Sequence, residues 1–138
     1  MGMNPDAINS EADVAEDQSA SRMDPKIKAQ WVAALRSGEY KQGKGVLRKG
    51  NELCCLGVLC EVAILSGIEL KVHHKNGYTQ YDGHGSGLPG TVREWAGLDD
   101  GQPYTSRMDD DGFPMRISHV NDGGASFEQI ADLIEAEF

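Results

Sequence analysis

The sequence predicts an α+β domain built around one buried central helix, and three features of the chain indicate it. Residues 53–67 form an apolar run in which only Glu61 is charged and which ends at a glycine. A run of this kind is typical of a helix buried on nearly every side. Two shorter stretches alternate around turn sequences, as β-hairpins do. Apolar residues at helical spacing near both ends of residues 24–138 add flanking N- and C-terminal helices.

The chain of 138 residues divides into a tail and one domain. Residues 1–23 are rich in Asp, Glu, Ala, Ser and Asn, contain no aromatic residue and show no sustained apolar period. Such a composition predicts a disordered acidic tail. Residues 24–138 are enough for one modest hydrophobic core, so we expect a single α+β domain there.

Several features of the composition predict a cytoplasmic protein. The first residues are polar and acidic, so no secretory signal is expected, and no apolar run reaches the ~20 residues that a membrane span needs. The three cysteines fall within seven positions of one another. This number and spread do not suit a disulfide framework, which indicates a reducing compartment. We therefore expect no membrane partner.

The first predicted helix spans residues 24–38. Asp24-Pro25 supplies an N-cap followed by proline at the first helical position, and Gly38 ends the helix. A tryptophan in the middle of an apolar stripe is expected in the core. The apolar stripe consists of Ile27, Trp31, Ala34 and Leu35.

A hairpin of residues 46–48 and 52–54 is expected to lead directly into the buried helix. On that helix Gly57 and Glu61 lie four residues apart and share the gap between two apolar stripes. Because glycine lowers helix stability by about 1 kcal/mol relative to alanine, Gly57 predicts the close approach of another element. Glu61 must reach solvent, a basic side chain or a ligand, since an unpaired buried carboxylate is costly.

The second half of the chain gives further local signals. Residues 70–81 alternate around Asn76-Gly77, the strongest short-range signal of a hairpin. The glycine-rich residues 82–90 predict a mobile loop, and residues 88–97 a short helix. Residues 98–120 are acidic and read as irregular, with a strand at 115–118. A capping box at Ser126 then begins the C-terminal helix.

The net charge of −9 is unevenly distributed. Residues 24–53 carry seven bases and three acids, whereas the rest of the chain is strongly acidic. An acidic protein is a poor binder of duplex nucleic acid, because neutralisation of phosphates supplies most of that affinity. A local basic patch can still hold one small anion.

This basic segment begins a candidate anion site, because residues 40–45 are expected to form a basic, glycine-bearing loop. Backbone amides beside glycines, with two lysines next to them, could cradle a phosphate, and an arginine could clamp it. A tyrosine could stack on the ligand, and the glycine-rich loop could close over it. The alternative is a hairpin lead-in whose lysines are simply solvated. The residues of the candidate site are Lys41, Lys44, Arg48, Tyr40, Tyr78 and His84.

A cysteine nucleophile is a second hypothesis. Cys54 and Cys55 fall at the expected start of the central helix, where the helix dipole and free amides lower a thiol pKa. His119, oriented by Asn121 or Asp122, could act as the base of a papain-like or cell-wall-peptidase-like hydrolase. No local signature of such a family surrounds the cysteines, and cysteine is often a buried residue. The sequence lacks Cys-x-x-Cys, so we expect no metal site and no cofactor.

Four motifs together resemble a family of small proteins encoded by phages and prophages, particularly of actinobacteria. The resemblance covers about residues 24–138 and implies a phage accessory protein that acts in the host cytoplasm in counter-defence or host takeover. It brings no assigned catalytic or binding residues with it. The motifs are Trp31-x-x-Ala34-Leu35-x-Ser37-Gly38-x-Tyr40-x-Gln42 with Gly45-x-Leu47, then Cys54-Cys55-Leu56-Gly57-Val58-Leu59-Cys60, then Leu88-Pro89-x-x-Val92-x-x-Trp95-Ala96-Gly97-Leu98, and last Asn121-Asp122-x-Gly124-x-Ser126-Phe127-x-x-Ile130-Ala131-Asp132-Leu133-Ile134.

The expected function is therefore binding rather than catalysis. The expected ligand is a small anionic, nucleotide-like molecule or a host protein. The cysteine hydrolase is one alternative, and an acidic protein that binds or mimics a partner is another. The sequence leaves self-association open.

Overall fold

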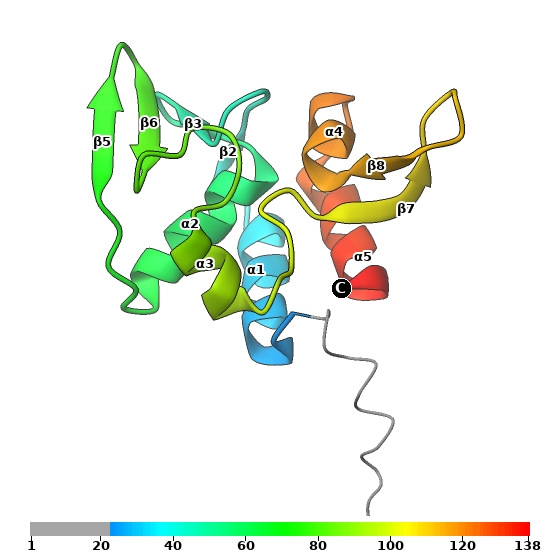
Figure 1. Ribbon diagram of the computed structural model, residues 1–138, viewed down its shortest axis with the longest axis horizontal. Helices are drawn as coiled ribbons and strands as arrows, with labels where there is room; N and C mark the ends of the chain where they lie inside the picture. The colour runs from blue at the N-terminus through cyan, green and yellow to red at the C-terminus, as the bar shows by residue number, and fades with distance from the viewer. Residues whose placement is uncertain (1–22) are drawn as a thin grey trace, which may run out of the picture.

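The computed structural model describes residues 23–138, so all of the predicted tail except Met23 lies outside the described residues (Figure 1). The described residues form five helices and two small sheets, which confirms the predicted α+β class. The elements in chain order are α1 (Pro25–Arg36), β2 (Lys41–Gln42), β3 (Arg48–Lys49), β4 (Glu52–Leu53), α2 (Cys55–Leu65), β5 (Val72–Lys75), β6 (Tyr78–Tyr81), α3 (Gly90–Ala96), β7 (Tyr104–Met108), β8 (Pro114–Arg116), α4 (Ile117–Asp122) and α5 (Phe127–Glu137).

Helix α2 is the buried centre that the sequence predicts. Its first six residues are all buried, and α1, α3 and α4 pack against it. The close approach expected at Gly57 is present, because a Cβ atom there would lie 2.0 Å from the carbonyl oxygen of Leu47. The loop before β3 therefore rests directly on the helix backbone.

Helix α1 begins and packs as expected. The Asp24 carboxylate accepts hydrogen bonds from the backbone N–H of Lys26 at 2.8 Å and of Ile27 at 3.2 Å. Trp31 is fully buried, and its indole N–H donates to the Cys55 carbonyl at 2.9 Å. Its ring also packs edge-on against Phe138, so one side chain joins α1 to α2 and to the end of α5.

The larger sheet has the strand order β2-β4-β3-β6-β5 and contains both predicted hairpins. Strands β3 and β4 pair antiparallel, as do β5 and β6. Asn76 and Gly77 join the latter pair with φ values of 54° and 84°, as a two-residue hairpin turn requires. Strand β2, which pairs parallel with β4, was expected to be loop; two residues are too short to show a period.

The prediction for residues 98–120 was wrong in part. Instead of an irregular segment with a strand at 115–118, the chain forms the β7–β8 hairpin and then α4, which includes Ser118. The start of α4 depends on a distant contact, because the Ile117 N–H donates to the Pro103 carbonyl at 2.8 Å. Helix α4 has no side-chain cap, so its sequence carries no start signal.

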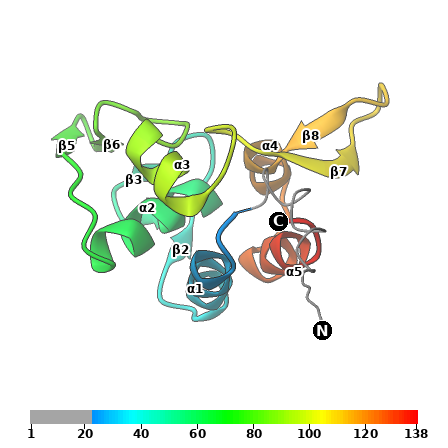
Figure 2. The same ribbon diagram turned by 60° about the horizontal axis from the view of Figure 1, so that its bottom comes forward.

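The β5–β6 hairpin and the β7–β8 hairpin lie at opposite ends of the molecule (Figures 1 and 2). Both views place β5 and β6 at one end, β7 and β8 at the other, and the helices between them. Met23, the last residue of the predicted tail, is buried. None of the helices in residues 23–138 is long and apolar enough to cross a bilayer.

Candidate functional site

The three cysteines are buried in the core. Cys54 is 3% exposed, and Cys55 and Cys60 are fully buried. Burial raises the pKa of all three thiols, and it outweighs the backbone hydrogen bonds that favour the thiolates of Cys54 and Cys55. Because the thiolate is the nucleophilic form, this environment opposes the activation expected at a helix N-terminus.

The histidine and asparagine of the hydrolase hypothesis form no hydrogen bond with a cysteine thiol in residues 23–138. The side chain of His119 is exposed on α4, and no histidine in residues 23–138 hydrogen-bonds to a cysteine. Asn121 is fully buried, and its carboxamide is used elsewhere. The oxygen accepts from the Cys55 N–H at 3.3 Å and from Gln42 Nε2 at 2.9 Å, while Nδ2 donates to the Gly43 carbonyl at 2.8 Å. Asn121 thus joins α4 to β2 and to the start of α2.

Two of the predicted anion-binding bases already face carboxylates. Lys41 Nζ lies 3.6 Å from Glu52, and both side chains are largely exposed. Arg48 Nη1 lies 3.3 Å from Glu61. An anion at Arg48 would have to compete with this carboxylate for the guanidinium.

The remaining predicted residues lie on separate segments, two of them beside β2 and two on β6 or directly after it. Tyr40 lies near Glu61, and burial together with that negative charge raises the pKa of Tyr40. Lys44 is exposed in the loop after β2. Tyr78 is 43% exposed on β6, and the exposed His84 pairs its backbone with that of Tyr81. The anion site remains a prediction.

Glu61 finds the polar partners that its place on an apolar helix requires. Its Oε2 accepts a hydrogen bond of 2.5 Å from the Tyr81 hydroxyl and also faces Arg48. Burial raises the pKa of Tyr81, and the hydrogen bond to Glu61 acts in the same direction. Helix α2 is thereby joined to β3 and β6, which makes this cluster a structural link.

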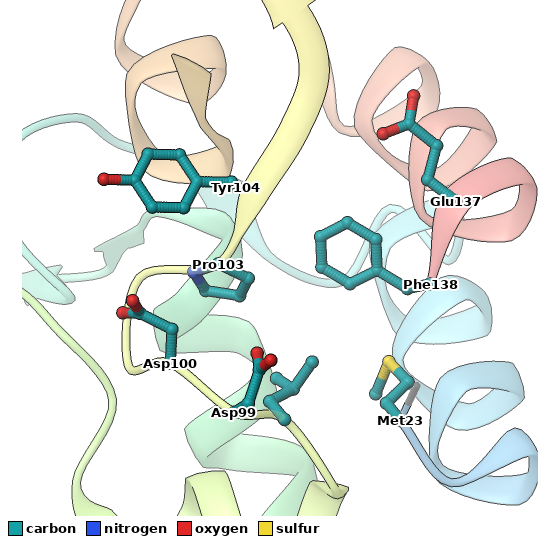
Figure 3. Close-up of a pocket in the computed structure, with 8 residues that line it drawn as sticks. Met23, Asp99, Asp100, Pro103, Tyr104, Glu137 and Phe138 are labelled. Carbon is teal, nitrogen blue, oxygen red and sulfur yellow. The ribbon is translucent and has the colours of Figure 1, made fainter. Parts of the chain in front are cut away.

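A pocket of about 380 Å³ lies where the segment after α3 meets the ends of α1 and α5. Figure 3 shows the Asp99 carboxylate turned toward the gap that Pro103, Phe138 and Met23 surround. The charged groups of the lining are all carboxylates. The lining residues are Met23, Leu98, Asp99, Asp100, Pro103, Tyr104, Glu137 and Phe138.

These three carboxylates differ in whether they already have a hydrogen-bond or ion-pair partner within the protein. Glu137 accepts from both the N–H and the hydroxyl of Ser106. Asp100 lies 3.2 Å from Arg116, whose guanidinium also stacks 4.2 Å from the centroid of the Tyr104 ring. Asp99 is exposed and has neither an ion pair nor a side-chain hydrogen bond within the described part of the chain. It is the carboxylate that a cationic ligand could reach.

Sequence reasoning did not find this pocket. Asp99 was part of a segment read as acidic and irregular, and Phe138 is the last residue of the chain, beyond the capping box that predicted the C-terminal helix. The one local signal was the pair of acids directly after the apolar Leu98. Residues 99 and 138 are far apart in the chain and line the same pocket only in the tertiary structure, so no short stretch of sequence indicates that they meet.

The geometry defines a small α+β domain with a buried cysteine-bearing helix and an acidic surface pocket. The chain belongs to the family described as Domain of unknown function (DUF8296), which matches residues 23–138. No curated protein and no solved structure matches it. In residues 23–138 no group of three or more His, Cys, Asp or Glu side chains could hold a metal ion.

Proposed function

We propose that this chain is a phage-encoded accessory protein that acts by binding a basic segment of a host protein. The observation that carries the proposal is the Asp99 carboxylate, which stands in a pocket of about 380 Å³ and lacks a basic partner within residues 23–138. A lysine or arginine side chain would neutralise Asp99 and lay its methylene groups against Leu98 and Phe138.

The charge of the protein supports a basic partner. A net charge of −9 attracts a cationic segment at long range and raises its association rate. Arg116 shows that a guanidinium is compatible with this region, since it is held by Asp100 and the face of Tyr104. The phage origin and the host protein as partner rest on the resemblance of the four sequence motifs.

A chemical-shift titration tests the proposal. The probes are a capped peptide of alternating arginine and leucine and its counterpart with glutamate in place of arginine. Only the basic peptide should shift the backbone amides around Asp99 and Phe138, and added salt should weaken its binding. Asp99→Asn should weaken binding about tenfold, because a charge-assisted contact is lost.

Glu39→Gln is the matched control. Glu39 is exposed in the segment between α1 and β2, and its replacement changes the net charge by the same amount as Asp99→Asn. The control should leave binding unchanged. Peptide binding that is insensitive to Asp99→Asn, or that shifts only distant amides, would refute this assignment.

The nucleotide-sequestration hypothesis predicts a different result. Mono-, di- or cyclic nucleotides would then raise the melting temperature of the wild-type protein, and the variant Lys41→Ala/Lys44→Ala would lose that stabilisation. This outcome, with no response to the basic peptide, would replace the acidic-pocket proposal by the anion site.

A further inference from the structure

The tip of the β7–β8 hairpin exposes large apolar side chains beside acidic ones. Met108 is 59% and Phe113 is 65% exposed, at the far end of a hairpin that extends from the body (Figure 2). Three consecutive aspartates lie between them in the sequence. We call residues 108–113 the arm tip. Exposed apolar groups rimmed by charges are typical of interaction surfaces.

The arm tip is held in one shape by Asp109. The carboxylate of Asp109 accepts from the backbone N–H groups of Asp111 and Phe113, each at 2.9 Å. The Asp109 N–H donates to the Phe113 carbonyl at 2.8 Å. Gly112 closes the turn with a φ of 84°. A tip that is already ordered loses little conformational entropy when it binds.

The opposite end of the molecule carries a hollow of complementary character, which we call the basic hollow. Its volume is about 390 Å³. Lys75 is the one charged residue of its lining, and Lys49 Nζ lies 5.5 Å from the centroid of the lining ring of Tyr78. Tyr78 on β6 thus lies opposite Lys49 on one neighbouring strand and Lys75 on the other. The lining residues are Val46, Lys75, Asn76, Tyr78, Gln80, Gly85 and Ser86.

We propose that the arm tip of one copy of this chain docks into the basic hollow of a second copy. Phe113 then packs against Tyr78, and Asp110 and Asp111 face Lys49 and Lys75. Opposite charges meet in this arrangement, and two aromatic rings are removed from water.

The placement of the two surfaces makes the contact intermolecular. Figures 1 and 2 show the β7–β8 hairpin and the β5–β6 hairpin at opposite ends, so a tip cannot reach the hollow of its own chain. Because two different surfaces meet, the contact is head-to-tail and produces a closed ring or an open chain of copies.

Sedimentation velocity of the full chain over a concentration series tests the proposal. The average mass should rise with concentration and fall as salt is added. Phe113→Ala should raise the dissociation constant at least about tenfold, as loss of a central aromatic contact does. The control is Leu65→Ala, at a side chain that is 79% exposed on α2, and it should leave association unchanged.

Charge reversal provides a stricter test. Lys49→Glu/Lys75→Glu and Asp110→Lys/Asp111→Lys should each sediment mainly as monomers. An equimolar mixture of the two variants should associate again, because a basic tip then meets an acidic hollow. The substituted side chains are all exposed, and circular dichroism melts verify that each variant folds.

A wild-type chain that stays monomeric up to its solubility limit would overturn the proposal. Association that Phe113→Ala leaves unchanged would overturn it as well. If the chain is monomeric and Phe113 is needed to bind a host protein, the arm tip serves that partner and the self-association proposal is wrong.

Discussion

The Glu61 carboxylate accepts a 2.5 Å hydrogen bond from the Tyr81 hydroxyl across the interface between α2 and the five-stranded sheet. Arg48 lies 3.3 Å from the same oxygen atom, so one carboxylate links the helix to two neighbouring strands. The side chains of Glu61 and Arg48 are 22% and 32% exposed, which leaves their interaction only partly screened by water.

Glu61→Ala should lower the free energy of unfolding by about 2 kcal/mol, because Tyr81 loses its hydrogen-bond acceptor in the core. Urea denaturation measures the change. Glu52→Ala removes the exposed pair with Lys41 and should cost less than about 1 kcal/mol. Equal losses in the two variants would show that the Glu61 cluster is no stronger than a surface pair.

Asn121→Ala should lower the free energy of unfolding by about 3 kcal/mol. The substitution leaves the Cys55 N–H and the Gly43 carbonyl without their side-chain partner at a fully buried position. His119→Ala is the control on the same helix and should change stability by less than about 0.5 kcal/mol, since its side chain is exposed. A neutral Asn121→Ala would contradict the structural role of this carboxamide.

Gly57→Ala should destabilise the protein by at least about 3 kcal/mol, because the new Cβ would lie 2.0 Å from the Leu47 carbonyl oxygen. Gly90→Ala is the matched control. Gly90 begins α3 with nothing within 4 Å of its Cβ position, so alanine there should be neutral or stabilising by up to about 1 kcal/mol. Thermal melts of the two variants give the comparison, and similar melting temperatures would be evidence against the close approach.

The buried thiols predict a loss of stability at alkaline pH. Burial raises the folded-state pKa of Cys54, Cys55 and Cys60 above their ordinary value of 9.0. As the pH rises past that value, the unfolded chain releases thiol protons that the folded chain retains, so unfolding becomes easier. The free energy of unfolding should therefore fall with each step of pH above 9.

Thiol labelling checks the same feature at pH 8. Iodoacetamide should modify the folded protein at least about a hundredfold more slowly than the protein in urea, because reaction waits for local opening. One rapidly labelled cysteine in the folded protein would revive the hydrolase hypothesis. A stability that stays constant above pH 9 would contradict the raised pKa values.

The elements that the sequence predicted correctly carry their signals within short windows. Both hydrogen bonds of the capping box at Ser126 are present. The Ser126 hydroxyl accepts from the Gln129 backbone N–H, and the Gln129 side-chain oxygen accepts from the Ser126 backbone N–H. The Asn76-Gly77 turn has the positive φ values that its residues favour. In both cases the residues that give the signal are the residues that make the contact.

The elements that the sequence missed depend on partners far along the chain. Strand β2 exists because Lys41 and Gln42 pair with β4, and Gln42 also bonds to Asn121, 79 residues later. The β7–β8 hairpin has an irregular register between Tyr104 and Met108, so its sequence shows no period of two.

The sequence by itself determined the α+β class, the buried helix α2, the N-caps of α1 and α5 and the Asn76-Gly77 turn. The reason is that propensity, periodicity and turn chemistry act over a few residues. The tertiary structure decided which charges meet and where the surface is hollow. Arg48, predicted to hold an anion, instead faces Glu61, and Asp99 shares a pocket with Phe138. The free energy of such contacts depends on long-range packing, which no short window of sequence encodes.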